Sequence, residues 1–81
     1  MSDATENGAV LIRLTRAEAL VLFEWLARVD AAGKLPVDDP AEQQVLWRLE
    51  GQLESTLIEP LGPNYQEAVA RARKEVRGSQ Q

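Results

Sequence analysis

The sequence predicts an all-α fold: a compact three-helix domain preceded by a short β-strand or extended arm. Residues 15–32 are apolar around most of a helix circumference, which is typical of a buried central helix. Residues 40–58 and 64–77 each begin with a helix-capping pattern and carry an apolar stripe at helical spacing. A chain of 81 residues has room for one domain, which we expect to span residues 9–78.

The N-terminal region divides into a polar tail and an apolar segment. Residues 1–8 are small and polar, and we expect them to be disordered. Residues 9–14 include β-branched side chains, which favour a strand. The candidates for strand pairing are Val10, Leu11, Ile12, Arg13 and Leu14.

A strand needs partners for its backbone groups, and the sequence leaves several partners open. Within the chain, residues 35–37 are the other extended candidate and could pair with residues 9–14 in parallel. The segment could instead lie on the helices as an arm, with Leu11 or Leu14 packed down and no ladder. Outside the chain, it could pair with its own copy in a dimer, or with another protein by strand addition.

The helix predicted over residues 15–32 has well-marked ends. Thr15 and Glu18 match the capping-box pattern at its start, and Gly33 is the usual residue for a left-handed helix end. Its central apolar stripe is Leu22, Trp25, Leu26 and Val29. Further apolar side chains widen this stripe on both sides and leave a narrow polar strip. Because a domain of this size buries little surface, either the chain wraps this helix or another chain meets it.

The second helix is expected over residues 40–58. Asp39 and Glu42 give it a capping box, and Pro40 takes its first position. Pro60 lies just beyond its expected end. Its core face comprises Val45, Leu46, Leu49, Leu53 and Leu57. We expect this face to pack on the central stripe of the first helix.

The opposite side of the second helix is the candidate partner-binding surface. It carries Trp47, Gly51 and Ile58, with Glu50 and Glu54 between them and the core face. Glycine in mid-helix costs ~1 kcal/mol relative to alanine, so Gly51 invites an explanation. One explanation is the close approach of a partner helix at Gly51, with Trp47 and Ile58 as its anchors. The other is that the third helix or the N-terminal arm covers this side.

The third helix is expected over residues 64–77, with Asn64 as its cap, Glu67 at the box position and Gly78 at its end. Residues 79–81 are expected to fray. Its outer face holds a basic cluster of Arg71, Arg73, Lys74 and Arg77. These cations could simply complement the helix macrodipole, pair with acids of the second helix, or contact an acidic partner or phosphates.

Composition excludes several functional classes. Nine basic against thirteen acidic residues give a net charge of −4, which argues against a general nucleic-acid binder. The chain has no cysteine and no histidine, and therefore lacks thiolate chemistry, the commonest general base and the commonest metal ligand. We expect no cofactor and no metal. The polar N-terminus and the lack of an apolar run of ~18 residues lead us to expect a cytoplasmic protein.

The carboxylates offer a weak catalytic signal. Glu50 and Glu54 are one helical turn apart, but such a pair is more often a solvated face than a catalytic dyad. The sequence contains no phosphate-binding loop, dinucleotide fingerprint, zinc-protease motif or nucleophile elbow. We therefore expect no enzymatic activity.

Three stretches carry a resemblance to other proteins. Residues 14–26 and 41–50, with Glu59 and Pro60 further along, resemble small uncharacterised bacterial helical proteins. The resemblance covers most of the chain and implies a stand-alone bacterial unit. Its motifs describe a helical core and imply no activity, ligand or partner.

The sequence favours a non-enzymatic protein–protein interaction module, such as a small bacterial accessory or immunity-type protein. Surplus apolar surface on the first helix and around Trp47 motivates this hypothesis. The partner would be another protein, for which the acidic charge suits a basic one, or a second copy in a homodimer. The alternative is a nucleic-acid-associated accessory protein that uses the basic cluster. A carboxylate-dependent enzyme that uses Glu50 and Glu54 comes third.

Overall fold

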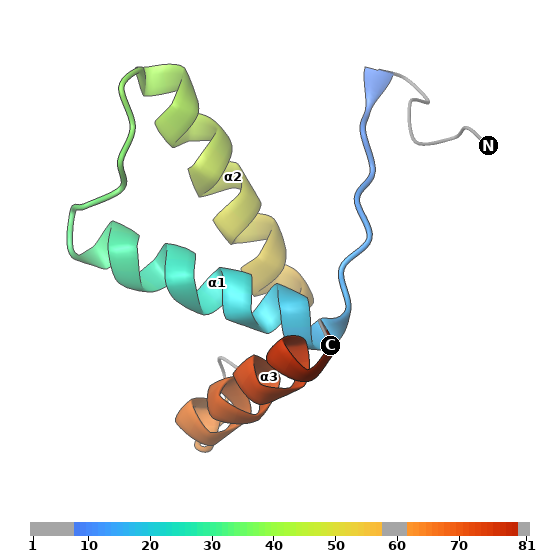
Figure 1. Ribbon diagram of the computed structural model, residues 1–81. Coiled ribbons are helices and arrows are strands. Elements are labelled where there is room, and N and C mark those ends of the chain that lie inside the picture. Colours follow the sequence, from blue (N-terminus) through green and yellow to red (C-terminus); the bar gives the residue numbers. More distant parts are fainter. Residues whose placement is uncertain (1–7, 58–61, 80–81) are drawn as a thin grey trace.

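Three helices make up the regular structure of the chain. The computed structural model describes residues 8–57 and 62–79 (Figure 1). Helix α1 spans Arg16–Ala31, α2 spans Pro40–Thr56 and α3 spans Tyr65–Ser79. No strand occurs in the described ranges, so the predicted all-α, three-helix fold is confirmed.

Side-chain caps begin the first two helices where the sequence predicts them. In α1, the hydroxyl of Thr15 accepts from the amide of Glu18 at 3.0 Å, and the Glu18 carboxylate accepts from the amide of Thr15 at 2.8 Å. Asp39 and Glu42 form the same reciprocal box at the start of α2. These bonds satisfy backbone donors that a helix start would otherwise leave without partners.

The end of α1 is a Schellman turn. Gly33 has a φ of 68°, the left-handed conformation that glycine adopts without steric cost. Its amide donates to the carbonyl of Asp30, and the amide of Lys34 donates to that of Val29, both at 2.9 Å. This turn ends α1 cleanly and starts the connection to α2.

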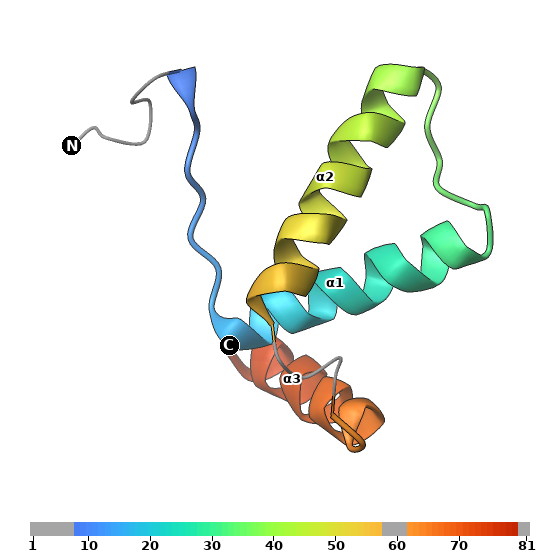
Figure 2. The same cartoon turned by 180° about the vertical axis from the view of Figure 1, so that it is seen from behind.

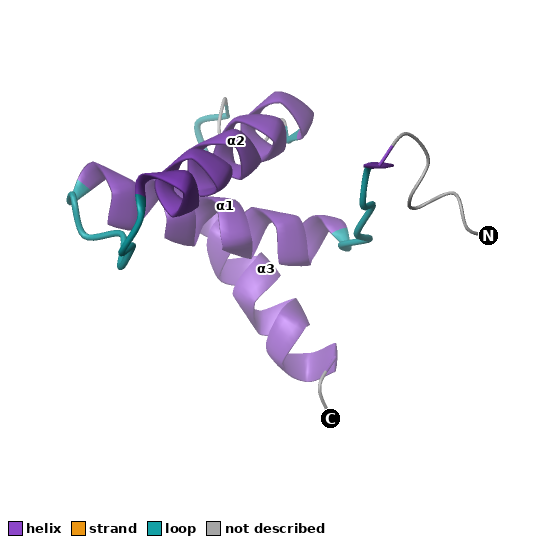
Figure 3. Ribbon diagram, turned by 90° about the horizontal axis from the view of Figure 1, so that it is seen from above, coloured by secondary structure: helices purple, strands orange, loops and turns teal. Residues whose placement is uncertain are grey.

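Helix α1 is the central element of the fold. Helices α2 and α3 pack on it from different sides and touch each other little, as the view from above shows (Figure 3). α1 and α2 diverge from the end where α1 begins, and the loop from α1 to α2 spans the open end of this V (Figures 1 and 2). The expectation that the other elements are arranged around the first helix is confirmed.

The core is thin and centred on a different face of α1 from the one predicted. Its buried residues are Ala17, Leu20, Phe23, Leu26, Leu53, Leu57, Val69 and Ala72. Trp25, placed by the sequence at the centre of the stripe facing the second helix, is 41% exposed. The prediction was wrong because α3 also packs on α1. The small side chains of Ala17 and Ala72 allow these two helices to pack together, and the face of α1 from Ala17 to Leu26 is therefore the buried one.

The arm, residues 9–14, runs away from the three helices in an extended course (Figures 1 and 2). It has no helix or strand assigned. Pairing with residues 35–37 does not form, because the amide of Val37 instead donates to the carbonyl of Leu35 at 2.9 Å in a tight local turn. Of the expected disordered tail only Gly8 lies within the described residues.

Candidate interaction surfaces

An apolar groove lies between the arm and the helices. This arm groove has a volume of about 610 Å³, within the ~300–1,000 Å³ range of ligand pockets. The residues that line it are Val10, Leu11, Ile12, Leu14, Ala19, Leu22, Leu49, Gln52, Leu53 and Thr56. None of these residues carries a charge. A groove of this composition suits an apolar protein segment better than a charged metabolite.

The two polar lining residues do little to change this character. The hydroxyl of Thr56 donates to the backbone carbonyl of Gln52 at 2.8 Å, so its hydrogen-bond donor is already used within α2. Gln52 is exposed at the groove edge and can turn to water. The floor of the groove is therefore aliphatic.

The apolar side chains of the arm are poorly covered by the rest of the described chain. Ile12 is 80% exposed, and Val10, Leu11 and Leu14 are also exposed. Within the described residues, no backbone–backbone hydrogen bond involves residues 9–14. Within the described residues, the arm therefore presents exposed apolar side chains and peptide groups that make no backbone–backbone hydrogen bond.

One flank of α2 lines the arm groove and continues past it to Val45. At 100° per residue, Val45, Leu49, Gln52 and Thr56 fall within about 60° of the helix circumference. Val45 is 64% exposed, although the sequence places it on the core face. The predicted core face is rotated, since Leu46, Leu53 and Leu57 face α1 and the Val45 edge is left outside. We call these four residues the α2 flank.

The predicted partner anchor Trp47 is engaged within the chain. Its indole Nε1 donates a hydrogen bond to Oδ1 of Asp30 on α1 at 3.1 Å. The side chain is nevertheless 49% exposed. It bridges the open part of the V between α1 and α2, on the other side of α2 from the α2 flank.

Glu50 lies beside this bridge. Burial, followed by the nearby carboxylate of Asp30 and then that of Glu54, raises the pKa of Glu50 above its usual value. The sequence did not single out Asp30, because its importance depends on where α2 crosses α1. Two acidic groups and one indole N–H meet there: the indole hydrogen bond links the two helices, whereas the two carboxylates repel each other.

The remaining candidates on this side of α2 lie in the open. Gly51 is exposed, and a Cβ added to it would meet no atom within 4 Å. No close helix approach within the described chain therefore explains this glycine. Glu54 is exposed, and Ile58 lies outside the described residues.

The basic cluster is spread out on the outer face of α3. Arg71, Arg73, Lys74 and Arg77 are all exposed. At 100° per residue they cover about 160° of the helix circumference, so they do not form one narrow stripe. The positive charge of Arg73 lowers the pKa of Tyr65, against the larger effects of burial and of Glu24, which raise it.

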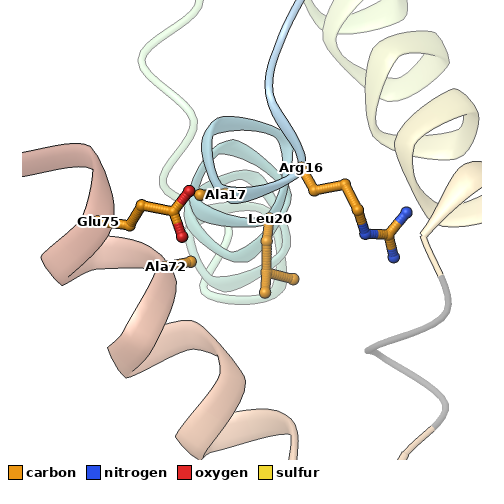
Figure 4. A pocket seen from close by; sticks show the side chains of 5 residues that line it. All are labelled: Arg16, Ala17, Leu20, Ala72 and Glu75. Carbon is orange, nitrogen blue, oxygen red and sulfur yellow. The ribbon is translucent and has the colours of Figure 1, made fainter. Parts of the chain in front are cut away.

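Cavities also occur elsewhere among the described residues. A cavity of about 170 Å³ between the start of α1 and α3 is below the usual range for ligands. Figure 4 shows Glu75 of α3 reaching toward Ala17 at the start of α1, whereas the side chain of Arg16 extends away from α3. A shallow groove of about 600 Å³ lies where residues 36–38 meet the start of α2, and Val45 lines it too.

Residues 8–57 and 62–79 contain no cluster of three or more side chains that could hold a metal ion. No described helix combines the length and apolar character needed to cross a bilayer.

In comparisons with known proteins, no family model, no curated protein and no solved structure matches this chain.

Proposed function

We propose that this chain is a non-enzymatic protein–protein interaction module, and that the arm groove with the exposed arm is its binding surface. As an accessory or immunity-type protein of the cytoplasm, it would act by occupying a partner. The single observation that carries this proposal is the uncharged, mostly aliphatic groove beside an arm that makes no backbone–backbone hydrogen bond with the described residues. Exposed apolar patches of this kind mark interaction sites in small proteins.

The charge distribution supports a protein partner. The whole chain carries −4, yet the residues lining the groove carry no charge. An apolar centre surrounded by charged residues is the usual anatomy of a protein interface. The acidic remainder of the surface would favour a basic protein through long-range attraction, unless the partner is a second copy.

The proposal can be tested by co-purification from the source cells. The tagged protein is compared with the variant L11S/I12S, which removes two exposed apolar side chains without touching the buried core. We expect the wild type to retain a partner in stoichiometric amount and the variant to lose it. The partner is either another protein or an untagged copy of the same chain.

A matched control carries serine at Gln66 and Ala70, two exposed positions of α3. It should retain the partner as the wild type does. If the arm variant and the control retain the same proteins, the arm groove is not the binding surface and the proposal fails.

A further inference from the structure

We infer that the occupant of the arm groove is a second copy of this chain, whose arm pairs antiparallel with the first arm around Ile12. This inference rests on the proposed function and names the partner for the same surface. Three observations carry it: the unused backbone groups of the arm, the exposed apolar surface and the order of residues within the arm.

The backbone of the arm requires a partner that is itself a strand. Residues 9–14 form no backbone–backbone hydrogen bond with the described chain, and residues 35–37 are occupied by their own turn. An extended edge of this kind is satisfied by strand addition. A second copy supplies a matching edge without any further protein.

Part of the exposed surface is apolar and is the surface that a dimer would cover. In the arm, Val10 is 74% exposed, Leu11 68% and Ile12 80%. Three of the four residues of the α2 flank line the arm groove, and the exposed Val45 adjoins them on the same side of the helix. A second arm placed in the groove would remove such side chains from water.

The order of residues in the arm permits self-pairing in a register centred on Ile12, in which residues 10–14 all face one another. With the two-fold axis at Ile12, Val10 faces Leu14 and Leu11 faces Arg13 of the other copy. Every pair then has at least one aliphatic member and no two arginines meet. An axis at Arg13 would place two like charges directly opposite each other, which destabilises a sheet.

The groove also fits a strand from a second copy. Its lining is uncharged and mostly aliphatic, so two acidic molecules would meet where the arm's Arg13 is the only charge that either brings. The arm of each copy forms one wall of its own groove, and the antiparallel arm of the other copy fills the space beside that wall. The contact is therefore the same for both chains and closes on itself.

The first measurement is the solution mass of the full chain by light scattering over a dilution series. We expect twice the 9.0 kDa chain mass at high concentration, with dissociation on dilution. A mass of 9.0 kDa at every concentration would overturn the inference. It would leave the proposed function to its own co-purification test, because a different protein could still occupy the groove.

The second measurement maps the register by disulfide formation. The chain has no cysteine, so each introduced thiol is the only one present. In the proposed register, I12C should cross-link to itself fastest. V10C should cross-link with L14C in a mixed sample and much more slowly with itself, because directly opposed residues have the short separation that a disulfide needs.

A third measurement tests the backbone pairing with two neighbouring prolines, L11P and I12P. Successive amides of an extended arm point to opposite edges, so one of the two prolines removes a donor that faces the partner strand and the other does not. We expect the dimer dissociation constants of these two variants to differ by about ten-fold or more. A dimer that tolerates both prolines equally, or that cross-links in no antiparallel register, would overturn the inference.

Discussion

The hydroxyl of Tyr65 donates a hydrogen bond of 2.6 Å to Oε1 of Glu24 and so ties the start of α3 to the middle of α1. Oε2 of the same carboxylate accepts from Arg28 at 3.5 Å, one turn further along α1. The Glu24 side chain is only 16% exposed, so its hydrogen bond with Tyr65 lies in a partly desolvated site. Burial, followed by the bond to Glu24, raises the pKa of Tyr65 well above its usual range.

Replacing Tyr65 with phenylalanine tests this link. Y65F keeps the ring and removes the donor, which leaves a partly buried carboxylate without its partner from α3. We expect a loss of about 1–2 kcal/mol in the free energy of unfolding, measured by urea denaturation at pH 7. The control Q66A changes an exposed neighbour and should leave the unfolding midpoint unchanged.

The same bond predicts a dependence on high pH. Because the pKa of Tyr65 is raised in the folded protein, the folded chain keeps a proton that the unfolded chain releases above about pH 10. The stability contributed by this proton is present below pH 10 and is lost as the pH rises further. We expect the unfolding free energy of the wild type to fall more steeply above pH 10 than that of Y65F. Parallel curves for the two proteins would contradict this assignment.

Glu50 predicts a dependence in the acidic range. Its raised pKa means that protonation favours the folded state, so its contribution is complete below the ordinary glutamate pKa and is lost as the pH rises through the folded value. The variant E50Q removes the repulsion from Asp30 and Glu54. At pH 7 we expect it to be more stable than the wild type by roughly 0.2–0.5 kcal/mol, a gain that shrinks towards pH 4. Thermal unfolding at both pH values tests this, and a gain independent of pH would refute the charge explanation.

Trp47 and Trp25 provide a matched pair for the bridge between α1 and α2. Both indoles are partly exposed, but that of Trp47 donates to Asp30, whereas Trp25 makes no hydrogen bond through its side chain within the described residues. We expect W47F to lose about 1 kcal/mol more stability than W25F in urea denaturation. Equal losses would show that the bond to Asp30 contributes nothing net.

Local signals predicted the helices well. Thr15 with Glu18 and Asp39 with Glu42 mark two helix starts within a single turn, and Gly33 marks an end by its own backbone freedom. These features depend on neighbours in the sequence, so no knowledge of tertiary structure was needed. Gly78 misled because a glycine permits a helix end but does not require one, and α3 runs to Ser79.

The side of a helix that becomes buried was harder to predict. α1 is apolar on so much of its circumference that hydrophobic periodicity could not separate the Trp25 side from the Ala17 side. Where α2 crosses α1 depends on both helix partners at once, and this decides that Val45 is exposed and that Asp30 meets Trp47. The arm groove was missed for the same reason: its lining comes from three segments that no local pattern connects.

A substitution at Gly51 distinguishes between the two candidate binding surfaces of α2, the arm groove and the Trp47 side. Since a Cβ at this position would meet open space and the backbone is helical, G51A should increase the free energy of unfolding by up to ~1 kcal/mol. Gly51 lies on the side of α2 away from the arm groove, so we expect G51A to leave self-association unchanged in the light-scattering series. The control G33A places a side chain at a φ of 68° and should instead lower the stability. If G51A weakened association while it stabilised the fold, the partner would contact the Trp47 side, and the arm groove would lose its claim as the interface.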